Sequence, residues 1–140
     1  MDGERNLDRL IGAMRPELHD GEFVFCTVSP EVYEALEVQP VGCFREEEGV
    51  TLILGRDIAE RTGLAYVYAS RLITLSVHSS LEAVGFLAVI AQALAAVGIS
   101  VNPVSAYYHD HLFVPVGKAE LALEVLNHLS IEAGQESGWN

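Results

Sequence analysis

Basic side chains are scarce in this 140-residue chain. It has 8 lysine and arginine residues against 20 aspartate and glutamate residues, which gives a formal net charge of −12 at pH 7. Nonspecific affinity for nucleic acids comes chiefly from Lys and Arg contacts to phosphates, and anionic membranes attract the same cations. The charge balance therefore excludes nucleic acids and anionic membranes as expected partners.

We expect neither a secretory leader nor a membrane span in this sequence. Residues 1–4 are not a basic region, and no apolar stretch follows them, so we expect a cytoplasmic location. The most apolar segment, 81–99, contains Glu82, Gln92 and Gly98 and has no basic flanks. This segment is interpreted as a buried helix of a soluble protein.

Cysteine is represented by two residues only, Cys26 and Cys43. They show neither CxxC spacing nor a neighbouring histidine, so nothing indicates a metal or redox site. Each lies in an apolar, strand-like run, where a thiol acts as a small hydrophobic group. We predict that both are reduced core residues.

The composition that remains is that of a folded chain, because half of the residues are hydrophobic and a fifth are charged. The length allows one ordinary domain or two very small ones that share a core. Ser29 and Pro30 predict the cap and first residue of a helix, and Gly63 predicts the end of another. The predicted order over 1–69 is helix 6–14, strand 22–29, helix 30–36, strands 41–45 and 50–54, helix 56–62 and strand 65–69.

The second half repeats most of this order. It predicts a strand at 72–77, a loop and helix over 82–98, a strand at 99–108, a hairpin into 112–116 and a helix at 118–129. A last strand is not evident, and the polar segment 132–140 is expected to be frayed. Strand, helix, strand, strand, helix, strand is the ferredoxin-like order. We therefore expect an α+β fold of two tandem ferredoxin-like (βαββαβ) units in one compact body, sharing an antiparallel sheet with helices on one face.

The helix that begins near Gly85 is apolar on nearly all of its faces. Such a helix must be buried on more than the side that faces a sheet. Either the first half or a second copy of the chain covers it, and a symmetric homodimer is expected.

The segment Glu82-Ala83-Val84-Gly85, between a strand and this helix and followed by Ser-Val-Asn-Pro-Val-Ser at 100–105, resembles an ACT domain. ACT domains are small ferredoxin-like modules that bind amino acids and regulate other proteins. Their loop has the form Asp-x-x-Gly, so glutamate here replaces aspartate. The whole chain resembles small tandem ACT-like proteins of bacteria, and its paired design is similar to the eukaryotic cytosolic arginine sensors. The resemblance implies a first half at 1–69 that includes the N-terminal helix, a second ACT domain at 70–131 and a flexible tail at 132–140.

A physical argument also supports a ligand site at this loop. Unpaired backbone N–H groups at a helix N-terminus attract a carboxylate, and the strand 99–108 should lie beside them. Glu82 or Asp110 would accept an ammonium group or a cationic side chain, and Asn102 would contact the α-amino group. The alternative is that Ser79 and Ser80 only cap the helix and no ligand binds. The expected ligand-binding residues are His78, Ser79, Ser80, Leu81, Glu82, Gly85, Asn102, Val104, Ser105 and Asp110.

His109 and His111 are the other candidates for chemistry, because residues two apart on a strand face the same side and could share a metal with His78. However, residues 107–112 fall where a hairpin must turn, and Asp110 is a natural turn residue. We expect these histidines to be structural or to line the ligand, with no metal and no cofactor.

The leading hypothesis is therefore a non-catalytic regulatory module, a homodimer that binds an amino acid and acts on a regulated enzyme or regulator. The second is an interaction module of the same fold without a ligand. The third is a small metal-dependent enzyme that uses His78, His109 and His111. The sequence contains no Ser-His-Asp order and no phosphate-binding glycine loop, so an enzyme is not expected.

Overall fold

The computed structural model describes residues 3–137, with side chains described through residue 134. The chain divides into two compact units. Unit 1 consists of Met1–His19 together with Leu72–Asn140, and unit 2 is Asp20–Arg71. Strand β5 (Val67–Leu75) runs from unit 2 into unit 1, so each unit has an antiparallel sheet that includes part of β5.

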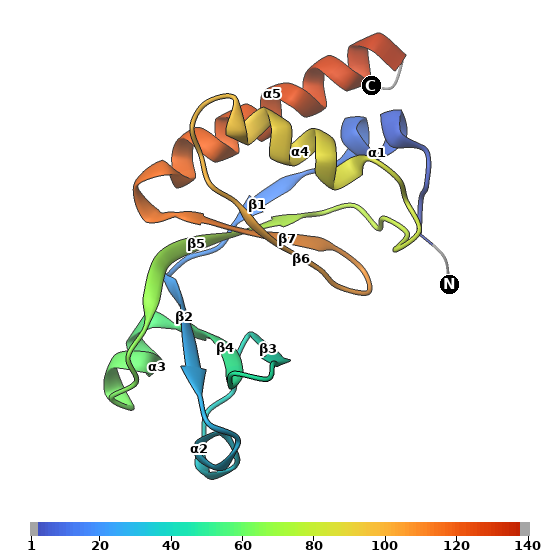
Figure 1. The fold of residues 1–140 in the computed structure, drawn as a ribbon. Coiled ribbons are helices and arrows are strands. Elements are labelled where there is room, and N and C mark those ends of the chain that lie inside the picture. The colour runs from blue at the N-terminus through green and yellow to red at the C-terminus, as the bar shows by residue number, and fades with distance from the viewer. Residues whose placement is uncertain (1–2, 138–140) are drawn as a thin grey trace. The chain divides into compact units, whose positions relative to one another are not determined.

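Unit 2 is a complete ferredoxin-like unit (Figure 1). Its strands are ordered β3-β4-β2-β5, and neighbouring strands are antiparallel. Its elements are β2 (Phe23–Val28), α2 (Pro30–Ala35), β3 (Gly42–Arg45), β4 (Val50–Gly55), α3 (Arg56–Arg61) and the first part of β5.

Local sequence signals explain most of these elements. The Ser29 side chain accepts a hydrogen bond from the Val32 N–H, and Pro30 is the first residue of α2. Gly63 follows α3 with a φ of +72°, a left-handed conformation that glycine adopts without strain. The core of this unit is made by Val24, Cys26, Val50, Leu52, Leu54 and Ala59.

Two expectations for unit 2 were wrong. Cys43 is exposed rather than buried, because β3 is a short edge strand with three exposed residues. The expected strands at 65–69 and 72–77 form one strand, β5. The polar residues between them do not interrupt it, since Ser70 donates a hydrogen bond to the Phe23 carbonyl oxygen at 2.8 Å. A bulge in the pairing of β2 with β5 includes Tyr68, whose φ is +61°.

Unit 1 has the strand order β1-β5-β7-β6. The fourth strand that the second half lacks is β1, which pairs with the end of β5 through Pro16↔Leu75 and Leu18↔Ile73 (blue beside green in Figure 1). Residues 3–19 thus pack with residues 72–137, although their sequence adjoins the first half. The elements are α1 (Leu7–Ala13), β1 (Pro16–Leu18), α4 (Phe86–Ala95), β6 (Asn102–Ser105), β7 (Asp110–Pro115), the 3-10 turn η1 (Val116–Lys118) and α5 (Ala119–Ser137).

Helices α1, α4 and α5 lie on one face of this sheet, and the core of unit 1 lies between them and the strands (Figure 1). Helix α5 continues to Ser137, so the expected end at 129 was wrong; residues 138–140 lie outside the described part. Packing explains the extension. Ser130 donates to the Gly12 and Met14 carbonyl oxygens at 3.1 Å, and a Cβ on Gly12 would lie 3.4 Å from the Gly134 Cα, so α1 and α5 approach closely.

Within residues 3–137, the helices are too short or too polar to cross a membrane.

Candidate functional site

The connection between β5 and α4 spans residues 76–85 and carries most of the predicted site. It is held by its own backbone: the Ser79 N–H donates to the Val77 oxygen at 3.0 Å, and the Ala83 N–H donates to the Ser80 oxygen at 3.0 Å. Gly85 precedes α4 with a φ of +91°, and among the described residues no side chain caps this helix. The expected capping of the helix by Ser79 or Ser80 was therefore wrong, since the Ser80 hydroxyl accepts from the Glu82 N–H within the loop.

Asp110 is the buried polar centre of this region, with 6% of its surface exposed. Its Oδ2 accepts a hydrogen bond from the Ser79 hydroxyl at 2.9 Å, and its Oδ1 accepts one from the Ser105 hydroxyl at 2.6 Å. Asp110 is the first residue of β7 and not a turn residue as expected; the turn lies at residues 107–108, where the Ala106 N–H donates to the His109 oxygen. Three of the predicted residues thus meet through a carboxylate and two hydroxyls.

Two cavities adjoin this loop. The first, called the α4 cavity, has a volume of about 210 Å³ and includes the first turn of α4 and the Asp110 carboxylate. The second, called the hairpin cavity, has a volume of about 190 Å³. The α4 cavity is lined by Ser79, Ser80, Leu81, Ala83, Gly85, Phe86, Leu87, Ala88, Ser105 and Asp110. The hairpin cavity is lined by Gly3, His78, Ser79, Ser80, Leu81, Glu82 and Tyr107.

Eight of the ten predicted residues line one or both cavities, and Asn102 and Val104 line neither. The register explains this difference. Ser105 pairs with Asp110, whereas Val104 pairs with His111, and side chains alternate between the faces of a strand. Asn102 and Val104 therefore lie on the face of the sheet opposite to Ser105 and Asp110.

An N-terminal segment that the sequence analysis did not include crosses the loop. The Glu4 N–H donates to the His78 oxygen at 2.8 Å, and the Ser80 N–H donates to the Glu4 oxygen at 2.9 Å. Arg5 forms an ion pair with Glu82. No local pattern in residues 3–6 indicates this contact, because it depends on chain segments more than seventy residues apart.

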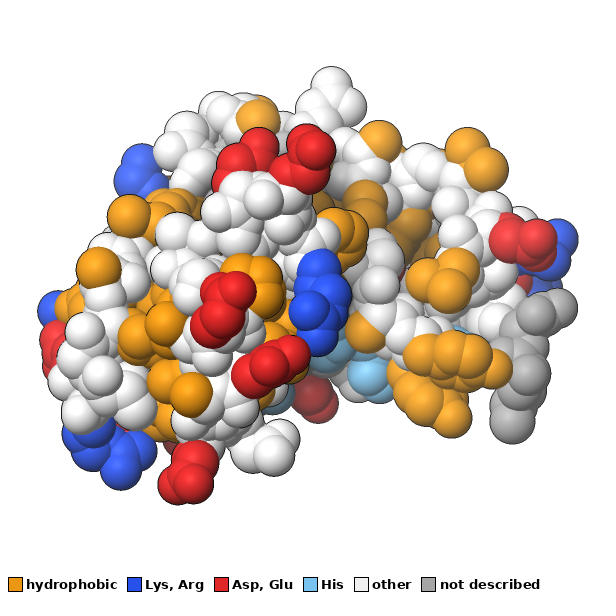
Figure 2. All heavy atoms as spheres, turned by 60° about the horizontal axis from the view of Figure 1, so that its bottom comes forward, with side chains coloured by type: hydrophobic (Ala, Val, Ile, Leu, Met, Phe, Trp, Pro, Cys, Tyr) orange, Lys and Arg blue, Asp and Glu red, His pale blue; other side chains and the backbone are white. Residues whose placement is uncertain are grey.

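The histidines make hydrogen bonds and ring contacts with neighbouring groups. The His111 Nδ1 lies 2.9 Å from the Thr74 hydroxyl, the His109 Nδ1 lies 3.2 Å from the Val77 oxygen, and the His78 ring lies 5.3 Å from the Tyr108 ring. Imidazoles are visible beside an exposed group of hydrophobic side chains in Figure 2. Burial lowers the pKa of His111, and the nearby His109 and His19 lower it further. Within the described part of the chain, no three His, Cys, Asp or Glu side chains are grouped so that they could hold a metal.

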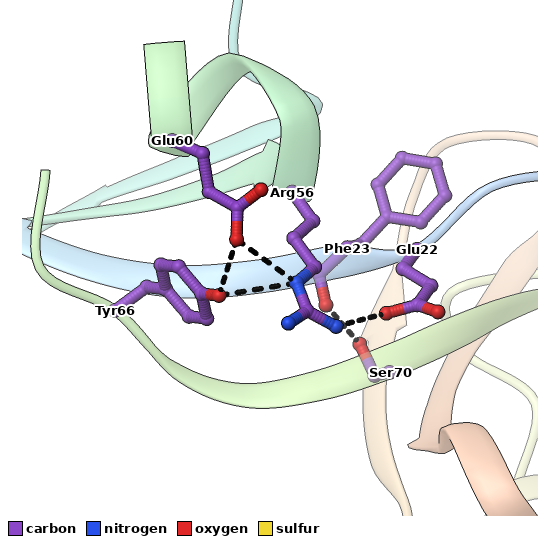
Figure 3. A network of polar contacts seen from close by, with 6 residues as sticks. All are labelled: Glu22, Phe23, Arg56, Glu60, Tyr66 and Ser70. Carbon is purple, nitrogen blue, oxygen red and sulfur yellow. Dashed lines mark hydrogen bonds and ion pairs between the residues drawn. The ribbon is translucent and has the colours of Figure 1, made fainter. Parts of the chain in front are cut away.

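Unit 2 contains a different polar group, centred on Arg56 (Figure 3). The Arg56 guanidinium contacts the Glu22 carboxylate at 2.7 Å, the Tyr66 hydroxyl at 3.0 Å and the Glu60 carboxylate at 3.4 Å. Glu22 and then Tyr66 raise the pKa of Arg56 above its ordinary value. The contacts join α3 to the residue before β2 and the residue before β5, so they hold the unit together at one edge of an open cavity of about 510 Å³.

Comparisons with known proteins also find two domains in this chain. Two sequence profiles, both described as the ACT domain, match the chain over residues 2–71 and 67–128. The chain belongs to the ACT domain family. The two matches of this ACT domain protein meet within β5, the strand that both units use.

Several solved structures share the fold of this chain. A Vibrio cholerae protein of unknown function, described as a possible transport protein, is 45% identical to this ACT domain protein, with a TM-score of 0.80 over 89% of this chain and 95% of the other. The ligand-free regulatory subunit of aspartate kinase from Thermus thermophilus has a TM-score of 0.68 at 12% identity, over 85% and 97% of the two chains. An Agrobacterium tumefaciens protein has a TM-score of 0.65 at 15% identity, over 84% and 89%. A comparison with curated proteins finds no match.

Proposed function

We propose that this ACT domain protein is a non-catalytic regulatory module that binds a free amino acid in the α4 cavity. The observation that carries the proposal is the buried carboxylate of Asp110. Removing a carboxylate from water is costly unless other groups compensate for the lost hydration. Two serine hydroxyls supply part of that compensation, and a bound ammonium group would supply the rest.

The other unit shows that the fold does not require this carboxylate. β4 and β7 are the third strands of their units, both have six residues, and both show the same alternation of buried and half-buried positions. The first residue of β4 is Val50, paired with Arg45, and the first residue of β7 is Asp110, paired with Ser105. A buried valine thus takes the place of the aspartate at the equivalent strand position of unit 2.

The lining of the α4 cavity is complementary to both charges of an amino acid. Asp110 accepts one hydrogen bond on each carboxylate oxygen, and each oxygen has a further lone pair for an α-ammonium group. The first N–H groups of α4 have no partner within the helix, and its first turn contains no acidic side chain within the described residues. These N–H groups and the helix dipole favour an α-carboxylate.

The same proposal includes a partner and a location. Regulatory subunits of aspartate kinase share this fold, so we propose that the ligand-bound protein acts on an enzyme or regulator in the cytoplasm. The fold alone supports the class of partner and not its identity.

A thermal-shift screen of the wild-type protein with the twenty amino acids tests the ligand. A ligand at about one hundred times its Kd should stabilise the fold by about 2.7 kcal/mol, which is a rise of several degrees in Tm. Asp110→Asn keeps the shape and removes the charge, so it should reduce the shift to well below half of its wild-type size. Unchanged melting of the wild-type protein with every amino acid at millimolar concentration would overturn the proposal.

A second candidate is a dimerisation or docking module without a ligand, and the surface near α4 favours it. The sequence of α4, FLAVIAQALA, has no charged residue, and Val84 and Leu81 in the preceding loop are 84% and 68% exposed. A symmetric dimer would cover such a surface. Light scattering should then give about twice the chain mass, and Val84→Glu should reduce it to one chain mass. A monomeric wild-type protein would remove this candidate.

A further inference from the structure

We infer that the amino acid bound in the α4 cavity has an uncharged, apolar side chain; this inference rests on the proposed function. It follows from a count of the charges that the cavity offers to a ligand. Asp110 is the single ionisable side chain among the residues that line the α4 cavity. Once this carboxylate holds the α-ammonium group, no lining side chain remains to neutralise a second charge on the ligand.

The rest of the lining is mostly apolar. Leu81, Ala83 and Leu87 contribute aliphatic side chains, and Ala88 and Phe86 contribute further apolar surface from the first turn of α4. A charged side chain placed against this surface would lose its hydration without gaining a partner. An acidic side chain would in addition be repelled by the Asp110 carboxylate.

The acidic residue of the loop, Glu82, does not change this count. It lines the hairpin cavity and not the α4 cavity. Its carboxylate is paired with Arg5, which the N-terminal segment brings to the loop. A cationic ligand would therefore have to extend into the other cavity and compete with a guanidinium of the same chain.

The volume also favours a small ligand. Pockets that enclose larger molecules usually exceed roughly 300 Å³, whereas the α4 cavity has about 210 Å³. An amino acid with a short aliphatic side chain fits this space better than one with a long charged side chain. Charge, lining and volume thus point to the same class.

Isothermal titration calorimetry on the full-length protein tests the inference. The apolar probes are L-valine, L-isoleucine and L-leucine, and the charged probes are L-lysine, L-arginine, L-aspartate and L-glutamate. At least one apolar probe should bind with a Kd about tenfold or more below that of every charged probe. N-acetyl-L-valine, N-acetyl-L-isoleucine and N-acetyl-L-leucine lack the ammonium group and should not bind the wild-type protein.

Two variants locate the contact. Asp110→Asn should raise the Kd of the apolar probe by roughly thirtyfold or more, the usual effect of removing one partner of a buried charge pair. Asn102→Ala is the matched control, since Asn102 lies on the opposite face of the sheet and should leave the Kd unchanged. If Asp110→Asn does not fold, the N-acetylated probes on the wild-type protein still report whether the ammonium group is recognised.

The outcomes separate the inference from the proposed function. Tighter binding by a charged probe than by every apolar probe would overturn the apolar class and leave the amino-acid site in place. Binding of an N-acetylated probe as tight as that of its parent would overturn the role of Asp110. The absence of binding by every amino acid would overturn the proposed function and this inference with it.

Discussion

Units 1 and 2 repeat one strand order but differ in the segment that joins the first strand to the first helix. In unit 2, Ser29 alone separates β2 from α2, whereas residues 76–85 separate β5 from α4 in unit 1. Helix α2 has no buried residue, and α4 buries Phe86, Ile90 and Leu94. The long connection lines both cavities beside α4. A duplicated fold can thus keep its strand order in both copies and differ in the connection that lines the cavities beside the first helix.

The largest expected effect comes from placing the unit 1 carboxylate in unit 2. Val50 is 2% exposed and pairs with Val28 and Arg45, whereas Asp110 accepts hydrogen bonds from two serine hydroxyls. Val50→Asp should lower the free energy of unfolding by on the order of 3–5 kcal/mol, since it buries a carboxylate without those hydroxyls, and pairing with Arg45 would require the guanidinium to leave the Tyr33 ring. Urea unfolding measures this loss, and Val50→Asn is the control of the same shape without charge. If Val50→Asp and Val50→Asn lowered the free energy of unfolding equally, a charge at this position would carry no desolvation cost. That result would contradict the comparison with Asp110.

A pair of glycines provides the next test. Gly85 in unit 1 and Gly63 in unit 2 both have positive φ, and a Cβ would meet only an ordinary contact with Leu7 at Gly85 and nothing within 4 Å at Gly63. Alanine at either position should cost about 1–2 kcal/mol of backbone strain. Gly85→Ala should also weaken amino-acid binding, because Gly85 lines the α4 cavity. Thermal unfolding measures the stability of both variants, and ligand titration measures their affinity for the amino acid. If Gly85→Ala bound the amino acid as tightly as Gly63→Ala, Gly85 would not be part of the site.

A smaller effect should appear in the pH dependence of unit 1. The pKa of His111 lies below its ordinary value because of burial and then because of His109 and His19. At a pH between that lowered pKa and about 6.5, the unfolded chain binds a proton at this histidine and the folded chain does not. The free energy of unfolding is therefore unaffected by His111 above about pH 6.5 and decreases as the pH falls below it. His111→Gln should reduce the difference in unfolding free energy between about pH 7.5 and about pH 5. His128→Gln, at an exposed position of α5, is the control. If the unfolding free energy of His111→Gln changed with pH as much as that of the wild type, this account would be contradicted.

The smallest effect concerns the cysteines of unit 2. Burial raises the pKa of Cys26, and the thiolate is the reactive form, whereas Cys43 is exposed. Iodoacetamide should label Cys43 in the native protein and Cys26 only as fast as unit 2 opens. Gly63→Ala should speed the labelling of Cys26, and Gly85→Ala should not. Peptide mass spectrometry measures both rates, and rapid labelling of Cys26 in the wild type would contradict its burial.

The sequence predicted the elements that depend on neighbouring residues. Ser29 and Pro30 marked the start of α2, and Gly63 marked the end of α3, because caps and turns are local. The end of α5 was missed, since it depends on the packing of Gly134 against Gly12. The pairing of β1 with β5 was also missed, because the pattern of a three-residue strand is too short to identify its partner.

The arrangement of the candidate site residues was predicted in part. Ser79, Ser105 and Asp110 do come together, although for Asp110 the predicted turn was wrong. Asn102 lies on the other face because of the register of β6 with β7. Predicting this register requires the position of the hairpin turn, which the sequence analysis placed too late in the chain. The contact of Glu4 with the loop is a long-range backbone pairing that no side-chain pattern encodes.

The supply of a fourth strand from the N-terminus has a consequence for the order of folding. Leu18 must find Ile73, and an unfolded intervening chain makes this a long loop to close. Once unit 2 has formed, Phe23 is paired with Ser70. Only a few residues then separate this pair from the pair of Leu18 with Ile73. The shorter loop reduces the closure cost by roughly 2 kcal/mol. We expect amides of β4 to become protected before those of β1 in pulsed hydrogen exchange during refolding, with the inserted unit acting as the template on which the interrupted one is completed.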